Sequence, residues 1–121
     1  MRELTDHKVG ELNEAIRVQV MDDPDLDGAC HMYSVEWENE KGSYVNMLRF
    51  QKGPLKEAGA NGISVEALLA IVIDRLRGFQ RGQFACRENA LALTNTETAL
   101  MWLQKRTRER ISRGVEGTHK Q

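Results

Sequence analysis

Two helical patterns joined by a short polar segment constrain the fold of this 121-residue chain more than any other feature. From Ser64 to Gln80, apolar side chains recur at helical spacing; they are Val65, Leu68, Leu69, Val72, Leu76 and Phe79. A second pattern starts at Arg87 or Glu88 and ends at Gly114. Its apolar residues keep a rhythm of about seven residues, at Leu93, Leu100, Leu103 and Ile111. The two patterns predict a helical hairpin with an arginine-rich elbow.

The first third of the chain carries strand and turn patterns instead. Residues 16–20 alternate apolar and polar side chains, as a half-buried strand does, and the turn-forming residues of 22–28 end that strand. The first fourteen residues are polar and predict a short helix or an ordered arm. Residues 51–62 contain three glycines, a proline and an Asn-Gly step, so they are predicted to join the β part to the helices.

Residues 31–50 predict a β-hairpin. Tyr33, Val35 and Trp37 alternate on one face of its first strand, and the strand pattern resumes from Tyr44 to Phe50. We expect the turn at a Gly-Ser step within residues 39–43.

The segregated order of strands and helices predicts an α+β fold, with a small N-terminal antiparallel β-sheet followed by a long two-helix antiparallel hairpin. We expect a single domain over residues 1–121, with a β part at 1–62 and the hairpin and C-terminal tail at 63–121. Ser64 is expected to cap the first helix. Because two helices cannot enclose an apolar stripe on both sides, the hairpins are expected to pair across a symmetry axis, which makes the protein a homo-oligomer with sites between chains.

Charge and cysteine content narrow the class of protein. The 17 basic and 18 acidic residues nearly cancel, so a general affinity for a nucleic-acid polymer is not expected. Residues 1–40 hold 3 basic and 11 acidic side chains, and an anionic ligand is therefore drawn to the C-terminal half. Two cysteines are too few for a disulfide framework, no leader is visible, and the longest apolar run, 68–73, is far below the roughly 20 residues of a membrane span. We expect a soluble protein of a reducing cytoplasm.

The histidines and cysteines of the sequence show no recognisable catalytic or metal-binding pattern. His7, His31 and His119 stand singly without the spacing of metal ligands, so no metal site is expected. Cys86 has no histidine near it in sequence, and a small buried thiol is the favoured interpretation over a nucleophile. We expect a protein that is not an enzyme and has no cofactor.

The elbow between the helices carries side chains that suit an anionic nucleotide. Phe79 and Phe84 flank the turn, where an aromatic residue most often closes the core. Asn89 is able either to hydrogen-bond a ligand or to satisfy its own backbone, and both alternatives stay open. Four cations around the same elbow favour nucleotide binding as the role of these side chains. They are Arg75, Arg77, Arg81 and Arg87.

A second basic segment follows near the C-terminus. The run 105–110 is ordinarily a solvated helix face close to a helix end. It leads into a segment whose glycines let main-chain amides turn toward an oxyanion, with Arg113, Gly114, Val115, Gly117, Thr118 and His119 as candidate ligand-binding residues. A frayed tail is the alternative.

Four short motifs together resemble a known family. They are Gly53-Pro54-Leu55-Lys56-Glu57 with Asn61-Gly62, Ile73-Asp74-Arg75-Leu76 with Gly78-Phe79-Gln80, Cys86-Arg87-Glu88-Asn89-Ala90, and the segment Arg113 to His119. The chain from about residue 44 onward closely resembles the phage Thoeris anti-defence proteins of the first type, whose helical hairpin is shared with the phage anti-CBASS nucleotide sponges.

The resemblance implies a sponge that binds and sequesters cyclic nucleotide immune signals in the host bacterial cytoplasm without degrading them. The implied ligands are glycocyclic ADP-ribose isomers and, at a separate site, cyclic dinucleotides and trinucleotides. By position, Phe79 would stack on adenine, Asn89 would hydrogen-bond the ligand and Arg106 would meet the pyrophosphate, with Arg87 nearby, in a pocket shared between protomers of a dimer or a trimer of dimers. The tail 113–119 would serve the second site. The alternative is a nucleic-acid-binding or regulatory oligomer that uses the arginine-rich second helix.

Overall fold

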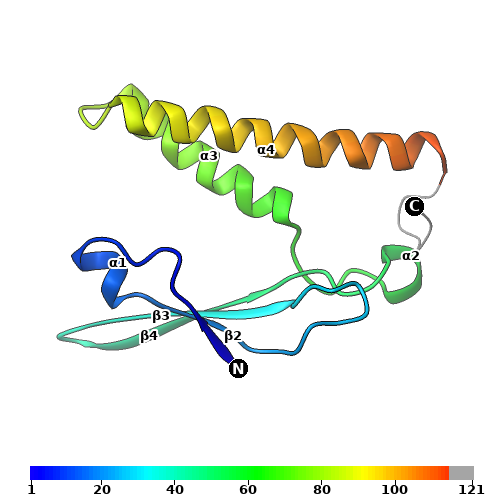
Figure 1. Ribbon diagram of the computed structural model, residues 1–121, viewed down its shortest axis with the longest axis horizontal. Helices are drawn as coiled ribbons and strands as arrows, with labels where there is room; N and C mark the ends of the chain where they lie inside the picture. Colours follow the sequence, from blue (N-terminus) through cyan, green and yellow to red (C-terminus); the bar gives the residue numbers. More distant parts are fainter. Residues whose placement is uncertain (115–121) are drawn as a thin grey trace. The chain divides into compact units, whose positions relative to one another are not determined.

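A computed structural model describes residues 1–114 of the chain (Figure 1). The chain divides into two compact units, Met1–Lys52 and a second unit from Gly53 onward, and each is described by itself. The first unit holds a four-stranded antiparallel sheet and the second holds the long helices. The predicted α+β class, with a small sheet before C-terminal helices, is therefore confirmed, while the self-association stays a prediction.

The sheet of the first unit is a simple meander in the order β1-β2-β3-β4. Its strands are β1 (Arg2–Leu4), β2 (Arg17–Val20), β3 (Met32–Asn39) and β4 (Gly42–Arg49). The short helix α1 (Glu11–Ala15) lies between β1 and β2 in the chain. The expectation of only a helix or an arm over residues 1–14 missed β1, because three residues are too few to show an alternating pattern and the strand exists through its pairing with β2.

The predicted β-hairpin is confirmed, but its turn differs from the expectation. Asn39 pairs with Gly42, so the turn consists of Glu40 and Lys41, and the Gly-Ser step begins β4. The Asn39 side-chain oxygen accepts a hydrogen bond from the Lys41 amide at 2.8 Å. Asparagine side chains form such local turns readily, and this one sets the register of the hairpin.

The predicted apolar face of β3 is present. Tyr33 lies opposite Val20, whose side chain is fully buried, and Trp37 stacks on its cross-strand partner Tyr44 with ring centroids 4.3 Å apart. Ser34 points to the other face and is also buried. The sheet is thus partly covered on both faces at its centre, which alternation alone did not indicate.

The loop between β2 and β3 is fastened at its base by Asp22. Its carboxylate accepts hydrogen bonds from the backbone amides of His31 at 2.9 Å and Met32 at 3.1 Å. The bond from the His31 amide is the main reason that the pKa of Asp22 lies below its ordinary value. These contacts stabilise the folded state at neutral pH, and that contribution is lost as the pH falls through the lowered pKa.

The second unit contains the helical hairpin. Its helices are α3 (Val65–Arg81) and α4 (Arg87–Ser112), preceded by the short α2 (Leu55–Ala58). Figure 1 shows α3 and α4 running side by side from the elbow, with α4 the longer helix. The predicted cap is confirmed, because the Ser64 hydroxyl accepts a hydrogen bond from the Ala67 amide at 3.0 Å. Helix α2 lies within the segment expected to be a joint; four residues give too short a pattern to detect.

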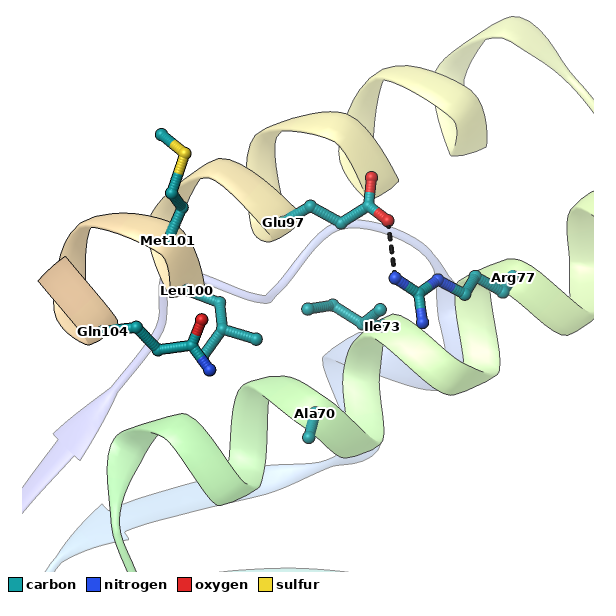
Figure 2. A pocket seen from close by; sticks show the side chains of 7 residues that line it. All are labelled: Ala70, Ile73, Arg77, Glu97, Leu100, Met101 and Gln104. Carbon is teal, nitrogen blue, oxygen red and sulfur yellow. Dashed lines mark hydrogen bonds and ion pairs between the residues drawn. The ribbon is translucent and has the colours of Figure 1, made fainter.

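Packing between α3 and α4 centres on Ile73, which is only 3% exposed. Figure 2 shows Ile73 directed toward Leu100, and Arg77 joined to Glu97 by an ion pair of 2.8 Å. The expected apolar stripe omitted Ile73 and included Val65 and Val72, both of which are exposed. Helix α3 carries apolar residues around much of its surface, so the position of α4 selects which ones are buried.

The rhythm predicted for α4 is correct in its first part. Leu93, Leu100 and Leu103 are half-buried, but Ile111 is exposed and its neighbour Arg110 is buried instead. Among the described helices, none has both the length and the apolar composition needed to cross a membrane.

We expect Ile73→Ala to lower the free energy of unfolding by about 2–4 kcal/mol, because it leaves a cavity between the two helices. Asp74→Ala is the control, since Asp74 follows Ile73 on the same helix, is exposed and does not belong to the uncovered apolar surface of the hairpin. Denaturant unfolding at low protein concentration measures both changes. Equal losses for the two variants would contradict the assignment of Ile73 as the centre of the hairpin.

Candidate functional site

The elbow between α3 and α4 is a tight turn fixed by its own hydrogen bonds. The amide of Gly82 donates to the carbonyl of Phe79 at 3.2 Å, and the amide of Ala85 donates to the carbonyl of Gly82 at 3.3 Å. The Gln80 side-chain oxygen accepts from the Cys86 amide at 3.1 Å. The last turn of α3 is thereby connected to the first residue before α4, and the side chains at this end of the hairpin have defined positions.

Two aromatic rings and one guanidinium meet at the elbow. Phe79 and Phe84 contact each other edge to face, with centroids 6.2 Å apart at 88°. The Arg75 guanidinium carbon lies 4.9 Å from the centre of the Phe79 ring. Phe79 is half-buried, whereas Phe84 is 65% exposed. The elbow therefore offers aromatic surface beside a positive charge, the combination that the sequence predicted for a nucleotide.

Asn89 has the structural role that was one of the two alternatives left open by the sequence. Its side-chain Nδ2 donates to the carbonyl of Phe84 at 3.3 Å, which holds the turn against α4. No described residue donates to its side-chain oxygen, so that atom is able to accept a hydrogen bond from a ligand amine or hydroxyl. One amide thus supports the elbow and still offers an acceptor.

Cys86 is not the buried thiol that the sequence predicted. It is exposed, and it precedes α4 as the N-cap residue, with its sulfur accepting a hydrogen bond from the Asn89 amide at 3.4 Å. A residue at a helix start projects its side chain along the first turn, which explains the exposure. The sulfur supports the helix end, and the elbow segment 75–90 contains no histidine to serve as its base.

The arginines of the elbow differ in their surroundings. Arg75 lies over Phe79, and Arg77 pairs with Glu97 of α4 on the hairpin. Arg81 and Arg87 are exposed at the end of α3 and the start of α4. Two guanidinium groups therefore flank the turn on the solvent side, where an anionic ligand can reach them.

Within one chain, Arg106 lies far from the elbow. It lies 17 residues after Asn89 on α4, and at ~1.5 Å per residue their Cα atoms are about 25 Å apart. One nucleotide cannot contact both residues of the same protomer. If both bind one ligand, Arg106 has to come from another copy of the chain.

The basic run 105–110 divides into residues with different partners. Lys105 pairs with Glu109, and its hydrogen bond holds the pKa of Glu109 below the usual range. Arg106 and Arg108 are exposed, whereas Arg110 is buried, which the interpretation as a solvated face did not anticipate. Of the arginines in this run, Arg106 and Arg108 present their charges to solvent.

The C-terminal candidates are described in part. The Arg113 side chain donates from Nε to the carbonyl of Glu109 at 3.4 Å, and Gly114 adopts a φ of +72°, which ends α4 as predicted. The other four candidates, Val115, Gly117, Thr118 and His119, lie outside the described residues.

The helical hairpin with its elbow defines the class of this protein. The family model for the Acb2/Tad1 hairpin domain matches residues 46–108, which is more than half of the chain. The protein belongs to the Acb2/Tad1 hairpin family. It is also similar to Thoeris anti-defense 1 of Bacillus phage SBSphiJ7, with 61% identity over 72 residues, and the predicted resemblance to the first type of Thoeris anti-defence protein is confirmed.

The matched region is limited in extent. It covers 60% of this chain and 51% of the Bacillus phage protein, so the chain matches about half the length of that relative. The family model begins within β4 and ends within α4. The elbow and its aromatic pair fall inside the matched region, while β1, β2 and β3 precede the family match.

We expect Asn89→Ala to lower the free energy of unfolding by about 1 kcal/mol, because the Phe84 carbonyl loses its donor. Gln83→Ala is the control, since Gln83 is an exposed amide in the same turn, and its effect should stay within about 0.5 kcal/mol. Chemical denaturation compares the two variants. A smaller loss for Asn89→Ala than for Gln83→Ala would show that the Asn89 side chain does not hold the turn.

Proposed function

We propose that this protein is a phage anti-defence sponge that blocks Thoeris immunity in the cytoplasm of the infected bacterium. It binds a cyclic nucleotide signal and keeps it from the downstream effector without degrading it. The observation that carries the proposal is the elbow, where an aromatic pair, an amide acceptor and guanidinium groups converge. The 61% identity to a protein named Thoeris anti-defense 1 supports the same conclusion.

The ligand that best fits the elbow is a glycocyclic ADP-ribose isomer. Its adenine would stack on Phe79, where Arg75 already supplies a cation over the ring. The free oxygen of Asn89 would accept a hydrogen bond from the base or a ribose, and Arg87 would add charge near the phosphates. A ring-closed pyrophosphate is preorganised, so little conformational entropy is lost when it binds.

Binding without turnover is consistent with the chemistry at the elbow. Hydrolysis would need a general base or an activated nucleophile within hydrogen-bond reach of the ligand. Cys86 already uses its sulfur to cap α4, and the segment 75–90 has no histidine. The proposed role is therefore capture, which is effective when the sites outnumber the signal and the dissociation constant lies below that of the effector.

The proposed pocket is completed by a second protomer. The separation of about 25 Å between Asn89 and Arg106 requires this if both contact one pyrophosphate ligand. Self-association also suits the amount of uncovered apolar surface on the helices. The large apolar side chains of α3 and α4 that are exposed in the single chain are Val65, Ile71, Val72, Leu91, Met101, Trp102 and Ile111. A dimer, or three dimers in a hexamer, would cover them.

A second class of ligand is proposed for the segment 113–119. Arg113 with the following glycines would hold cyclic dinucleotides or trinucleotides, which are richer in phosphate than the ADP-ribose isomers. This site would extend the anti-defence activity to CBASS signalling.

Replacing Arg113 and Thr118 together by Ala should weaken cyclic trinucleotide binding at least tenfold and leave the ADP-ribose isomer unaffected in calorimetry. Equal weakening of both ligands would contradict separate sites.

The first test is capture and release. The purified protein is incubated with glycocyclic ADP-ribose, freed of unbound ligand by filtration and then heat-denatured, and the released compound is analysed by chromatography. We expect intact ligand in near-stoichiometric amount. An altered product would show an enzyme, and failure to retain this ligand or any cyclic oligonucleotide would contradict the proposed function.

Variants locate the binding residues. Phe79→Ala combined with Asn89→Ala should abolish binding of the ADP-ribose isomer while the assembly seen by light scattering stays intact. Asn95→Ala is the control for an amide on the same helix.

Arg106→Ala should weaken binding at least tenfold, whereas Arg108→Ala, which removes the other exposed arginine of the basic run, should not. Equal losses for both arginines would indicate a general charge effect rather than a contact with the pyrophosphate.

A further inference from the structure

The loop between β2 and β3 brings together three side chains that the sequence did not connect. Asp25, Asp27 and His31 each offer a metal-ligating atom, and these atoms all lie within 4.8 Å of one another. His31 Nε2 lies 3.1 Å from Asp27 Oδ2 and 3.9 Å from Asp25 Oδ2. The ligands of a tetrahedral Zn²⁺ ion, bound at about 2.0–2.2 Å, stand roughly 3.4 Å from one another. The two distances from His31 Nε2 lie on either side of that spacing, so one small cation is able to contact the histidine and both carboxylates.

The histidine is buried and has an unused nitrogen. His31 is 8% exposed, and among the described residues its Nε2 has no hydrogen-bond partner. Although Asp27 Oδ2 is near, the two groups do not have hydrogen-bonding geometry. Atoms that coordinate one ion point at the ion rather than at one another, and a buried polar atom without a partner is otherwise costly. The unpaired nitrogen is thus available to coordinate an ion.

Each aspartate uses one oxygen for the loop and leaves the other for the cluster. Asp25 Oδ1 accepts from the Leu26 amide and Asp27 Oδ1 accepts from the Ala29 amide, both at 2.8 Å. Their Oδ2 atoms are the ones nearest to the histidine. Gly28 has a φ of +89°, which lets the chain turn back so that the cluster closes. The turn itself therefore orients both carboxylates.

The base of the loop holds the histidine in place. Asp22 accepts hydrogen bonds from the backbone of His31 and Met32, and the amide of Phe50 donates to the His31 carbonyl at 2.7 Å. The backbone that carries the imidazole is therefore fixed at the start of β3, while the side chains of Asp25 and Asp27 remain partly open to solvent. A metal ion has a route of entry, and water can fill its remaining positions.

We propose that Asp25, Asp27 and His31 form a binding site for a divalent transition-metal ion, with Zn²⁺ the best match. An imidazole with two carboxylates is a donor set that Zn²⁺ accepts, whereas Ca²⁺ and Mg²⁺ favour oxygen ligands alone. The loop also contains the Asp-x-Asp-x-Asp-Gly spacing of calcium loops, from Asp23 to Gly28. Asp23, however, is not part of the cluster, and the buried histidine is.

The ion would fasten the loop to the sheet. Because the ligands come from the loop and from the residue just before β3, one ion would join them as a crosslink. The folded state binds the ion in an assembled site that the unfolded chain lacks, so the metal raises stability by mass action. This role is independent of the elbow and of the proposed sponge activity.

The test is a titration of the 121-residue chain, first freed of metal with a chelator, with ZnCl₂ in an isothermal calorimeter. We expect one Zn²⁺ per chain and a rise in the unfolding temperature of about 5 °C or more at hundredfold excess over the dissociation constant. Cys86→Ser serves as the background, since an exposed thiol also binds zinc. Histidine ring signals followed by NMR should show that His31 is the histidine perturbed at the first equivalent.

Matched variants separate the site from a general attraction of cations to an acidic loop. Asp27→Asn keeps the Oδ1 acceptor of the turn but removes the ligating oxygen, and it should weaken Zn²⁺ binding at least tenfold. Asp23→Asn removes the same charge from an exposed position in the same loop and should change the affinity less than twofold. Absence of Zn²⁺ binding, equal effects of the two variants, or binding of CaCl₂ alone without a change at His31 would overturn the proposal and leave a histidine–carboxylate ion pair.

Discussion

The contact between α3 and α4 is the interaction on which the functional part of this protein depends. One buried side chain, Ile73, with Leu100 opposite it, and one ion pair, Arg77 with Glu97, hold two helices in an antiparallel hairpin. Burial of one large aliphatic side chain contributes roughly 1.5–3 kcal/mol, whereas an exposed ion pair contributes at most about 1 kcal/mol. Apolar packing therefore sets the alignment of the helices, and the alignment fixes the elbow.

At the elbow, structural and proposed binding roles fall on the same few residues. Asn89 uses its donor for the turn and keeps its acceptor, and Phe79 contacts both Phe84 and Arg75 while remaining half-buried. A preorganised site of this kind loses little entropy when a rigid cyclic ligand binds. Because the residues proposed to bind the ligand also hold the turn, changes there are expected to affect stability and affinity together.

Each unit buries few side chains by itself. Among the described residues, the buried hydrophobic ones are Val20, Cys30 and Ile73, while many large apolar side chains remain exposed. Small domains gain stability from crosslinks, ligands or partner chains when their own core is limited. The proposed metal site would add stability to the first unit. The proposed assembly of hairpins would add stability to the second.

The sequence by itself determined the kind of elements and their order. Period-2 and helical patterns located the β-hairpin and both long helices, Ser64 marked a helix start, and four motifs indicated the family. Tertiary structure decided which faces are used: Ile73 rather than Val72 is buried, Cys86 is exposed, and a three-residue β1 exists through its pairing. It also gathered Asp25, Asp27 and His31, whereas in the sequence each histidine stands singly and nothing places His31 beside the two aspartates. Local patterns depend on neighbours along the chain, whereas burial and side-chain clusters depend on neighbours in space that the pattern does not contain.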